Sequence, residues 1–289
     1  MNFSDALKTG RFLITTDVIP PKGIAISKTL SRLGSLAGKV DAVNVVDLPS
    51  SAMRVSSLPI AFLLKTRGLE PILQMTCRDR NRLALQADLL GAYLVGVTNI
   101  LALTGDEMNL SDDPEAKPVF DLDSIGLLRA ASELSKGRDL AGNRLRGIPK
   151  FCIGAAVDPG ADPLELEIEK MGKKLEAGAD FFQTQPIFDP GVLIEFLRKA
   201  GKIPVPLLGG VLLLKSAGMA RFMNEKVPGV RVPENLIRQM EQTKNPVQTA
   251  IQIASQIINE IKGVCAGLHI MTIHWEDKVP ILLEATGLI

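Results

Sequence analysis

The chain has 289 residues, of which 46% are hydrophobic and 22% charged, and its 33 basic residues nearly balance its 32 acidic ones. A net charge of +1 gives no electrostatic basis for binding nucleic acid or an anionic membrane surface. An aromatic content of 4% is too low for a platform that stacks bases. The length accommodates one α/β barrel, which takes about 250 residues.

The cysteines and the N-terminus indicate the compartment. Three widely separated cysteines form no C-x-x-C pair, so we expect neither a zinc site nor a secreted disulfide framework. Residues 1–10 carry Asp5 and Lys8 and lack an apolar core, which is unlike a signal peptide. No apolar run reaches the length of a membrane span. We therefore expect a cytoplasmic protein with no membrane contact and no bound metal.

Short runs rich in β-branched residues alternate along the chain with segments of helical spacing. The predicted strands are 11–18, 41–46, 70–76, 99–103, 150–157, 180–184, 205–210 and 267–271. The predicted helices are 25–37, 56–67, 79–91, 124–135, 163–178, 190–200, 216–224, 246–262 and 277–285. In helix 163–178, apolar residues recur every three or four positions, Asp162 is the expected N-cap and Pro163 the first helical residue.

Eight strands, each followed by a helix, predict parallel βαβ units. A closed barrel and an open doubly wound sheet both satisfy this alternation. The count of eight and the lack of a G-x-G-x-x-G turn favour a single-domain (β/α)₈ TIM barrel over residues 1–289. The seventh unit is expected to carry extra helices at about 228–262.

The site of such a barrel lies where the strands end. Four carboxylates, Asp17, Asp47, Asp106 and Asp158, are predicted to converge on that rim. Asp47 and Asp158 each precede a turn, so a helix-capping role is favoured for them. Asp17 lies in a β-branched run before two prolines, where no helix can begin, so it is a candidate acid whose pKa the site could tune.

Three further features of the sequence have both a structural and a functional interpretation. The glycine of Thr104-Gly105-Asp106 permits close approach of a ligand to the backbone, although the tripeptide could be a simple turn. Lys173 and Lys174 could reach phosphate groups or form a solvated helix face. His269 lies inside the last predicted strand and is interpreted as a buried residue, not a catalyst.

These residues resemble the short bacterial form of methylenetetrahydrofolate reductase, which consists of the catalytic barrel alone. The resemblance runs from Phe12 to Leu288, with the family's motifs in order at predicted strand ends and helices. Besides Asp17 with its two prolines, the matching segments are 74–77, 103–106, 117–121, 176–180, 184–189 and 215–219.

The resemblance implies a flavoprotein oxidoreductase of one-carbon metabolism, which reduces 5,10-methylenetetrahydrofolate to 5-methyltetrahydrofolate by hydride transfer from FAD. By this resemblance, Asp17 is the acid that protonates N10 of the folate, and Asp106 is the carboxylate near the flavin and the pterin. Gln185 is the glutamine that binds the folate. The positions that match FAD-binding residues of the family are Gln74, Thr104, Gly105, Asp106, Asp121, Asp158, Glu167, Lys170, Lys173 and Lys174. Of these, Glu167, Lys170 and Lys174 share one helical face.

Three departures from the family keep alternatives open. Asp17 stands where the family has a glutamate, Val46 where a threonine is usual, and Ala217 where some members carry an aromatic that stacks on nicotinamide. The electron donor is therefore either NAD(P)H or a partner subunit, in a homo-oligomer or a hetero-complex. The alternatives to an active reductase are a reductase for a related pterin and a flavin-bearing electron-transfer or scaffold subunit.

Overall fold

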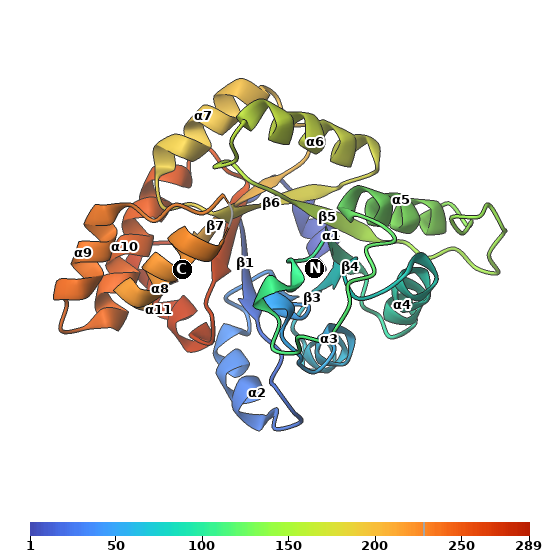
Figure 1. The fold of residues 1–289 in the computed structure, drawn as a ribbon, viewed down its shortest axis with the longest axis horizontal. Coiled ribbons are helices and arrows are strands. Elements are labelled where there is room, and N and C mark those ends of the chain that lie inside the picture. The colour runs from blue at the N-terminus through green and yellow to red at the C-terminus, as the bar shows by residue number, and fades with distance from the viewer. Residues whose placement is uncertain (228) are drawn as a thin grey trace.

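The computed structural model describes residues 1–227 and 229–289, and its strands close into one parallel barrel in the order β1 to β8 (Figure 1). The predicted (β/α)₈ barrel is therefore confirmed. The strands are β1 (Leu13–Val18), β2 (Ala42–Val45), β3 (Pro71–Thr76), β4 (Asn99–Leu103), β5 (Cys152–Val157), β6 (Phe181–Pro186), β7 (Leu207–Leu212) and β8 (Gly267–Met271).

The helices, apart from α1 at one end of the barrel, lie around the strands as an outer layer (Figure 1). They are α1 (Phe3–Leu7), α2 (Ser27–Leu33), α3 (Ser57–Lys65), α4 (Arg82–Leu94), α5 (Ser124–Ser135), α6 (Leu164–Glu176), α7 (Pro190–Ala200), α8 (Ala217–Lys226), α9 (Glu234–Gln242), α10 (Pro246–Ile261) and α11 (Val279–Ala285). Short 3₁₀ turns occur at η1 (Gly34–Leu36), η2 (Pro49–Ser51), η3 (Met108–Leu110) and η4 (Glu276–Lys278).

The strands are buried on both faces, as parallel strands covered by helices must be. One core cluster packs the helices onto the outside of the barrel, and a smaller one fills its interior. Above the interior cluster, Asn44 and Gln183 exchange hydrogen bonds of 2.7 and 3.2 Å. Thr15 accepts a hydrogen bond from Gln183 and contacts His269 Nδ1 at 3.0 Å. His269 is thus buried, as expected, and burial lowers its pKa to about 3.

The barrel is closed at one end by α1, a helix that the sequence patterns did not predict. The Phe3 side chain is 1% exposed and packs edge-on against Phe181, with ring centroids 5.2 Å apart. Gly154 leaves room for the Phe181 ring, because a Cβ at Gly154 would lie 2.3 Å from it. This end of the barrel is therefore filled with side chains.

Helix α6 and the segment between β7 and β8 differ in detail from their predictions. The N-cap of α6 is Pro163 and the helix begins at Leu164, so the prediction of Asp162 as the N-cap was wrong. Between β7 and β8 the chain forms three helices, of which α9 and α10 lie within the range of the predicted insertion and α8 precedes it. Pro228, the first residue of the predicted range 228–262, lies outside the described residues.

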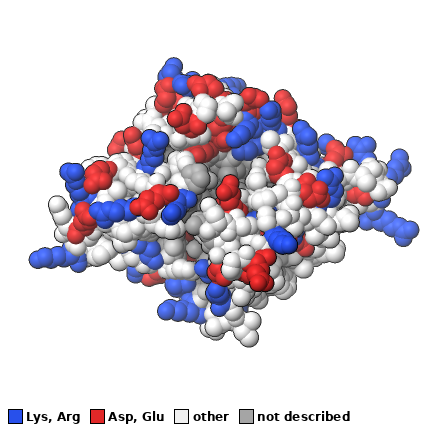
Figure 2. All heavy atoms as spheres, in the orientation of Figure 1, with Lys and Arg blue, Asp and Glu red and all other residues white. Residues whose placement is uncertain are grey.

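The surface charges are mixed. Basic and acidic side chains are interspersed over the face drawn in Figure 2. Across the described residues, none of the helices is both long and apolar enough to cross a membrane.

The packing of α1 generates a stability prediction. Replacing Phe3 with alanine should lower the free energy of unfolding by about 3–5 kcal/mol, because it leaves a cavity beside Phe181. The matched control is Phe222→Ala on α8, where the ring is 49% exposed and the loss should stay below about 1 kcal/mol. Urea unfolding followed by circular dichroism measures both, and equal losses would show that α1 does not plug the barrel.

Candidate active site

A cavity of about 330 Å³ lies at the carboxyl ends of strands β2 to β6, and we name it the rim cavity. Six of the predicted site residues line it: Gln74, Thr104, Gly105, Asp106, Lys174 and Gln185. They come from β3, from the segment after β4, from α6 and from β6. The rim cavity therefore combines hydroxyl, carboxylate, amide and ammonium groups from distant parts of the chain. The apolar side chain of Val46 also lines it.

The turn after β4 is held in a conformation that requires glycine. Gly105 has φ +102°, and a Cβ there would lie 2.9 Å from the Cβ of Arg78. The Arg78 side chain is 1% exposed and donates to the carbonyl oxygens of Leu48, at 3.1 Å, and Asp106, at 3.4 Å. The Asp106 carboxylate in turn accepts a hydrogen bond of 2.8 Å from the Ser50 N–H. The orientation of Asp106 is therefore set by contacts on both sides of the turn.

A buried lysine crosses from α6 to the rim cavity. Lys174 Nζ donates to the Ala156 carbonyl at 2.7 Å and lies 3.5 Å from Glu167 Oε1. Burial lowers the pKa of Lys174, and the nearby Glu167 carboxylate counteracts part of that effect. Glu167 Oε1 also accepts from the Asp158 N–H at 3.2 Å. The pair fixes a cation at the cavity wall.

Other predicted FAD-binding residues lie outside the rim cavity. Asp121 pairs with Arg82 and lines an adjoining hollow of about 610 Å³ that shares Thr104 and Gly105 with the rim cavity. Lys170 is exposed, and Lys173 is exposed and pairs with Glu169. The structure therefore does not join these three residues to the rim cavity, although the hollow at Asp121 adjoins it.

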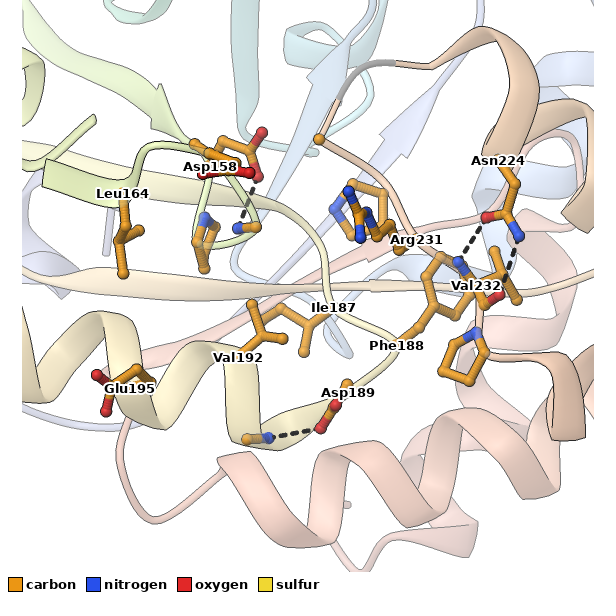
Figure 3. A pocket seen from close by; sticks show the side chains of 18 residues that line it. Asp158, Leu164, Ile187, Phe188, Asp189, Val192, Glu195, Asn224, Arg231 and Val232 are labelled. Atoms are coloured by element: carbon orange, nitrogen blue, oxygen red, sulfur yellow. Dashed lines mark hydrogen bonds between the residues drawn. The ribbon is translucent and has the colours of Figure 1, made fainter. Parts of the chain in front are cut away.

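Asp158 lines a separate cavity of about 950 Å³ between the segments that follow β5 and β6 and the segment before α9. Figure 3 shows Asp158, Ile187, Phe188 and Arg231 around this cavity. The Asp158 carboxylate accepts a hydrogen bond of 2.9 Å from the Gly160 N–H, which makes a local turn. Burial raises the pKa of Asp158.

The capping role expected for two aspartates was wrong. Asp158 closes the turn at Gly160 instead of the first turn of α6. Asp47 accepts from the Thr76 N–H and Oγ1 at 3.0 and 3.1 Å and from the Ser57 hydroxyl at 3.1 Å, and it pairs with Arg80. Asp47 thus ties the end of β2 to the end of β3.

Asp17 lies at the end of β1 and does not line the rim cavity. Its side chain is 7% exposed, and its Oδ1 accepts hydrogen bonds of 2.8 Å from both the N–H and the Oγ1 of Thr272. Burial raises the pKa of Asp17, whereas the two hydrogen bonds from Thr272 lower it; burial is the larger effect. The carboxyl therefore keeps its proton at a higher pH than an exposed aspartate does.

Two residues that orient this site had no predicted role. Arg78 holds the turn of Gly105, and Thr272 holds Asp17. Thr272 directly follows a predicted strand and Arg78 follows one by two residues, and this position is the sequence signal that could have drawn attention to them. Among the described residues, no group of three or more His, Cys, Asp or Glu side chains is placed to hold a metal ion.

Fold and site together define a (β/α)₈-barrel protein with a polar site at the carboxyl end of its strands. The family profile "Methylenetetrahydrofolate reductase" matches residues 2–287. The chain belongs to the methylenetetrahydrofolate reductase family.

Two relatives illustrate the breadth of that family. "Methylenetetrahydrofolate reductase 2" of Schizosaccharomyces pombe is 24% identical over 99% of this chain and 47% of its own length. "5,10-methylenetetrahydrofolate reductase" of Salmonella typhimurium is 23% identical over 95% of this chain and 89% of its own. The chain thus spans about half the length of the fungal relative and most of the bacterial one.

Solved structures support the fold. A protein from Clostridium thermocellum, described as binding two copies of 5-methyl-5,6,7,8-tetrahydrofolic acid, superposes with a TM-score of 0.71 at 14% identity, covering 100% of both chains. Oxaloacetate acetylhydrolase gives a TM-score of 0.55 at 11% identity, over 99% of this chain and 82% of its own. At these identities the likeness concerns the barrel alone.

The conformation of Gly105 generates a second prediction. Gly105→Ala should lower the free energy of unfolding by about 1–3 kcal/mol, because a side chain is strained at that φ and its Cβ would press on Arg78. Gly172→Ala on α6 is the control: no atom lies within 4 Å of its Cβ, and alanine is the better helix former. Unfolding in urea compares them, and an unchanged Gly105→Ala variant would contradict the strain.

Proposed function

We propose that this protein reduces 5,10-methylenetetrahydrofolate to 5-methyltetrahydrofolate with FAD as its cofactor. The observation that carries the proposal is the buried Asp17 carboxyl at a strand end, in a chain whose family match covers residues 2–287. A reduction of this substrate needs an acid that still holds its proton near neutral pH, and burial favours that state of Asp17.

The groups of the rim cavity fit FAD in their chemistry. Lys174 supplies an ammonium group suited to a phosphate oxygen, and the amides of Gln74 and Gln185 can donate to and accept from a ring edge. The backbone at Gly105 can approach a ligand closely. The proposed FAD-binding set remains Gln74, Thr104, Gly105, Asp106, Asp121, Asp158, Glu167, Lys170, Lys173 and Lys174. When bound and reduced, FAD would supply the hydride that becomes part of the product's methyl group.

Asp17 is the proposed general acid. Thr272 fixes its Oδ1, so Oδ2 is the oxygen that can carry the proton. Transfer of that proton to N10 of the folate breaks the bond between N10 and the bridging carbon and leaves a cationic iminium at N5. The proton stays on N10 in the product, and Asp17 is then an anion that must be reprotonated from solvent.

Asp106 and Gln185 have the proposed substrate roles. The Asp106 carboxylate, oriented by the Ser50 N–H, stabilises the positive charge of the iminium. The Gln185 amide can both donate and accept, which suits the mixed hydrogen-bonding edge of a pterin. Both side chains line the rim cavity, so they can act on one bound substrate.

A second candidate function rests on Val46. This apolar side chain lines the rim cavity where the family usually has a threonine. A flavin-bearing subunit that passes electrons within a complex, with little folate turnover of its own, would tolerate that loss of a hydroxyl. In either case the electron donor is NAD(P)H or a partner subunit, and the protein functions as a homo-oligomer or in a hetero-complex.

The function is tested by mixing purified, photoreduced protein with 5,10-methylenetetrahydrofolate without oxygen. We expect the absorbance of oxidised flavin to return while methylfolate accumulates. Flavin that stays reduced would instead favour the electron-transfer subunit or another pterin. Protein that purifies without flavin, and cannot be reconstituted with FAD, would contradict the cofactor assignment.

Asp17 gives the sharpest mutational prediction. Asp17→Asn should reduce methylfolate formation by at least about 10²-fold, because an amide cannot protonate N10. Reduction of the flavin by its own donor should change little, which serves as the internal control. A mutant with full folate turnover would exclude Asp17 as the acid.

A separate variant tests the side-chain length of the acid. Asp17→Glu should keep or raise the rate of methylfolate formation if the shorter aspartate only places the carboxyl too far from N10. A steep loss in the same assay would show that the pocket is shaped around aspartate, since shifts near 1 Å can cost about 10²-fold in rate.

A further inference from the structure

The segment that follows β2 has a strained backbone. Leu48, Ser50 and Ser51 all lie in the left-handed region, with φ of 44°, 54° and 56°. Residues other than glycine are uncommon there, and such a conformation persists only where the surroundings enforce it. We name residues 48–51 the 48–51 turn. Pro49, inside it, lines the rim cavity, so the strain lies at the candidate site.

Hydrogen bonds to the rim hold this turn in its conformation. The Leu48 carbonyl accepts from Arg78 Nη2 and from the Ser51 N–H, both at 3.1 Å. The Ser50 N–H donates to Asp106 Oδ2 at 2.8 Å. The strained backbone therefore directs one of its N–H groups at a carboxylate that lines the rim cavity.

The Ser51 side chain crosses from the turn to the segment after β4. Its hydroxyl donates to the Glu107 carbonyl at 2.9 Å and lies 3.5 Å from the Asp106 carbonyl. In return, the Ser51 carbonyl accepts from the Ser111 hydroxyl at 3.0 Å. Ser51 is 8% exposed, so water cannot easily take the place of its hydroxyl. The backbone that carries the Asp106 carboxylate is therefore held by the turn as well as by Arg78.

Asp106 depends on this support because the residue is exposed, and an exposed carboxylate without partners rotates freely. The Ser50 N–H engages its Oδ2. No donor among the described residues engages Oδ1, so that oxygen is available to a ligand in the rim cavity. A charge that is already oriented stabilises a developing cation without a cost of reorganisation. The orientation of Asp106 is therefore worth maintaining with a strained turn.

We propose that Ser51 is a positioning residue for Asp106: its hydroxyl holds the backbone of residues 106–107, so that the carboxylate stays paired with the Ser50 N–H and faces the rim cavity. This inference rests on the function proposed above, in which Asp106 stabilises the iminium. Ser51 does not line the rim cavity, so it acts through Asp106 and not on a ligand. Without the hydroxyl, the pairing should open more often and the carboxylate should adopt other orientations.

Hydrogen exchange, followed by NMR on the purified protein, measures this pairing directly and needs no turnover. In Ser51→Ala, the Ser50 amide should exchange at least about tenfold faster than in the wild type, because its bond to Asp106 opens more often. Asp106→Ala removes the acceptor and sets the upper limit of the effect. Ser56→Ala is the matched control, since that exposed serine makes no capping hydrogen bond, and it should leave the exchange unchanged. Equal exchange in Ser51→Ala and the wild type would overturn the inference.

Ser51→Gly separates positioning from stability. Glycine adopts a φ of 56° without strain, which offsets the loss of the hydrogen bond, so the urea midpoint should stay close to that of the wild type. The Ser50 amide should nevertheless exchange about as fast as in Ser51→Ala, because both variants lack the hydroxyl. If Ser51 served stability alone, exchange in Ser51→Gly would match the wild type, and the positioning role would be wrong.

Reoxidation of the flavin connects the positioning with function. With each protein saturated with FAD and photoreduced, reoxidation by saturating 5,10-methylenetetrahydrofolate should be about tenfold or more slower in both Ser51 variants, because a displaced Asp106 stabilises the iminium less well. Ser56→Ala should react like the wild type. If methylfolate forms equally fast in all of them, Ser51 does not position Asp106 for the reaction. If the wild type forms none, the proposed function fails, and hydrogen exchange alone decides whether Ser51 positions Asp106.

Discussion

The hydrogen bonds between Thr272 and Asp17 join residues 255 positions apart, across the seam where the last strand meets the first. They exist only because the barrel closes. Closure pairs β1 with β8 in parallel, so the ends of both strands reach the same rim. The candidate acid thus depends on the global fold for its hydrogen-bond donors and for the burial that raises its pKa. A local opening of this seam would expose Asp17 to water and remove both effects.

The interior of the barrel supports that rim from below. The α1 plug and the apolar cluster around Phe181 fill one end, and the polar layer of Asn44 and Gln183 lies above them. In the parallel register Asp17 lies opposite Asn44. Since every group in such a layer has a partner, it can be rigid without the cost of buried, unpaired polar atoms. Rigid strands are what hold catalytic groups to the precision that chemistry needs.

At the rim, basic side chains hold the backbone turns in place by donating hydrogen bonds to their carbonyl oxygens. Arg78 holds the turn of Gly105, Lys174 binds the Ala156 carbonyl, and Arg32 holds the segment after β8. Each is a cation that donates to carbonyl oxygens at or beyond the carboxyl end of a strand. The site therefore combines strained turns with the groups that enforce them, and part of the folding free energy maintains its geometry.

The sequence alone determined the fold class, because eight β-branched runs alternating with helical segments leave few other solutions. Most element boundaries followed from the same patterns, and β4, β8, α5 and α7 match their predicted ranges. Six predicted site residues, among them Gln74, Asp106 and Gln185, line the rim cavity, because strand ends in a parallel barrel share one face. Helix α1 was not predicted, because its five residues are too few to show a helical periodicity.

Only the tertiary structure decided which partners these residues have. The sequence did not predict that Thr272 donates hydrogen bonds to Asp17 or that Asp158 lines a separate cavity. It also did not predict the ion pair between Arg32 and the buried Glu276. Periodicity reports the direction in which a side chain points from its own element. A hydrogen bond or an ion pair depends on the register between elements far apart in the chain, and that register is fixed only when the barrel closes.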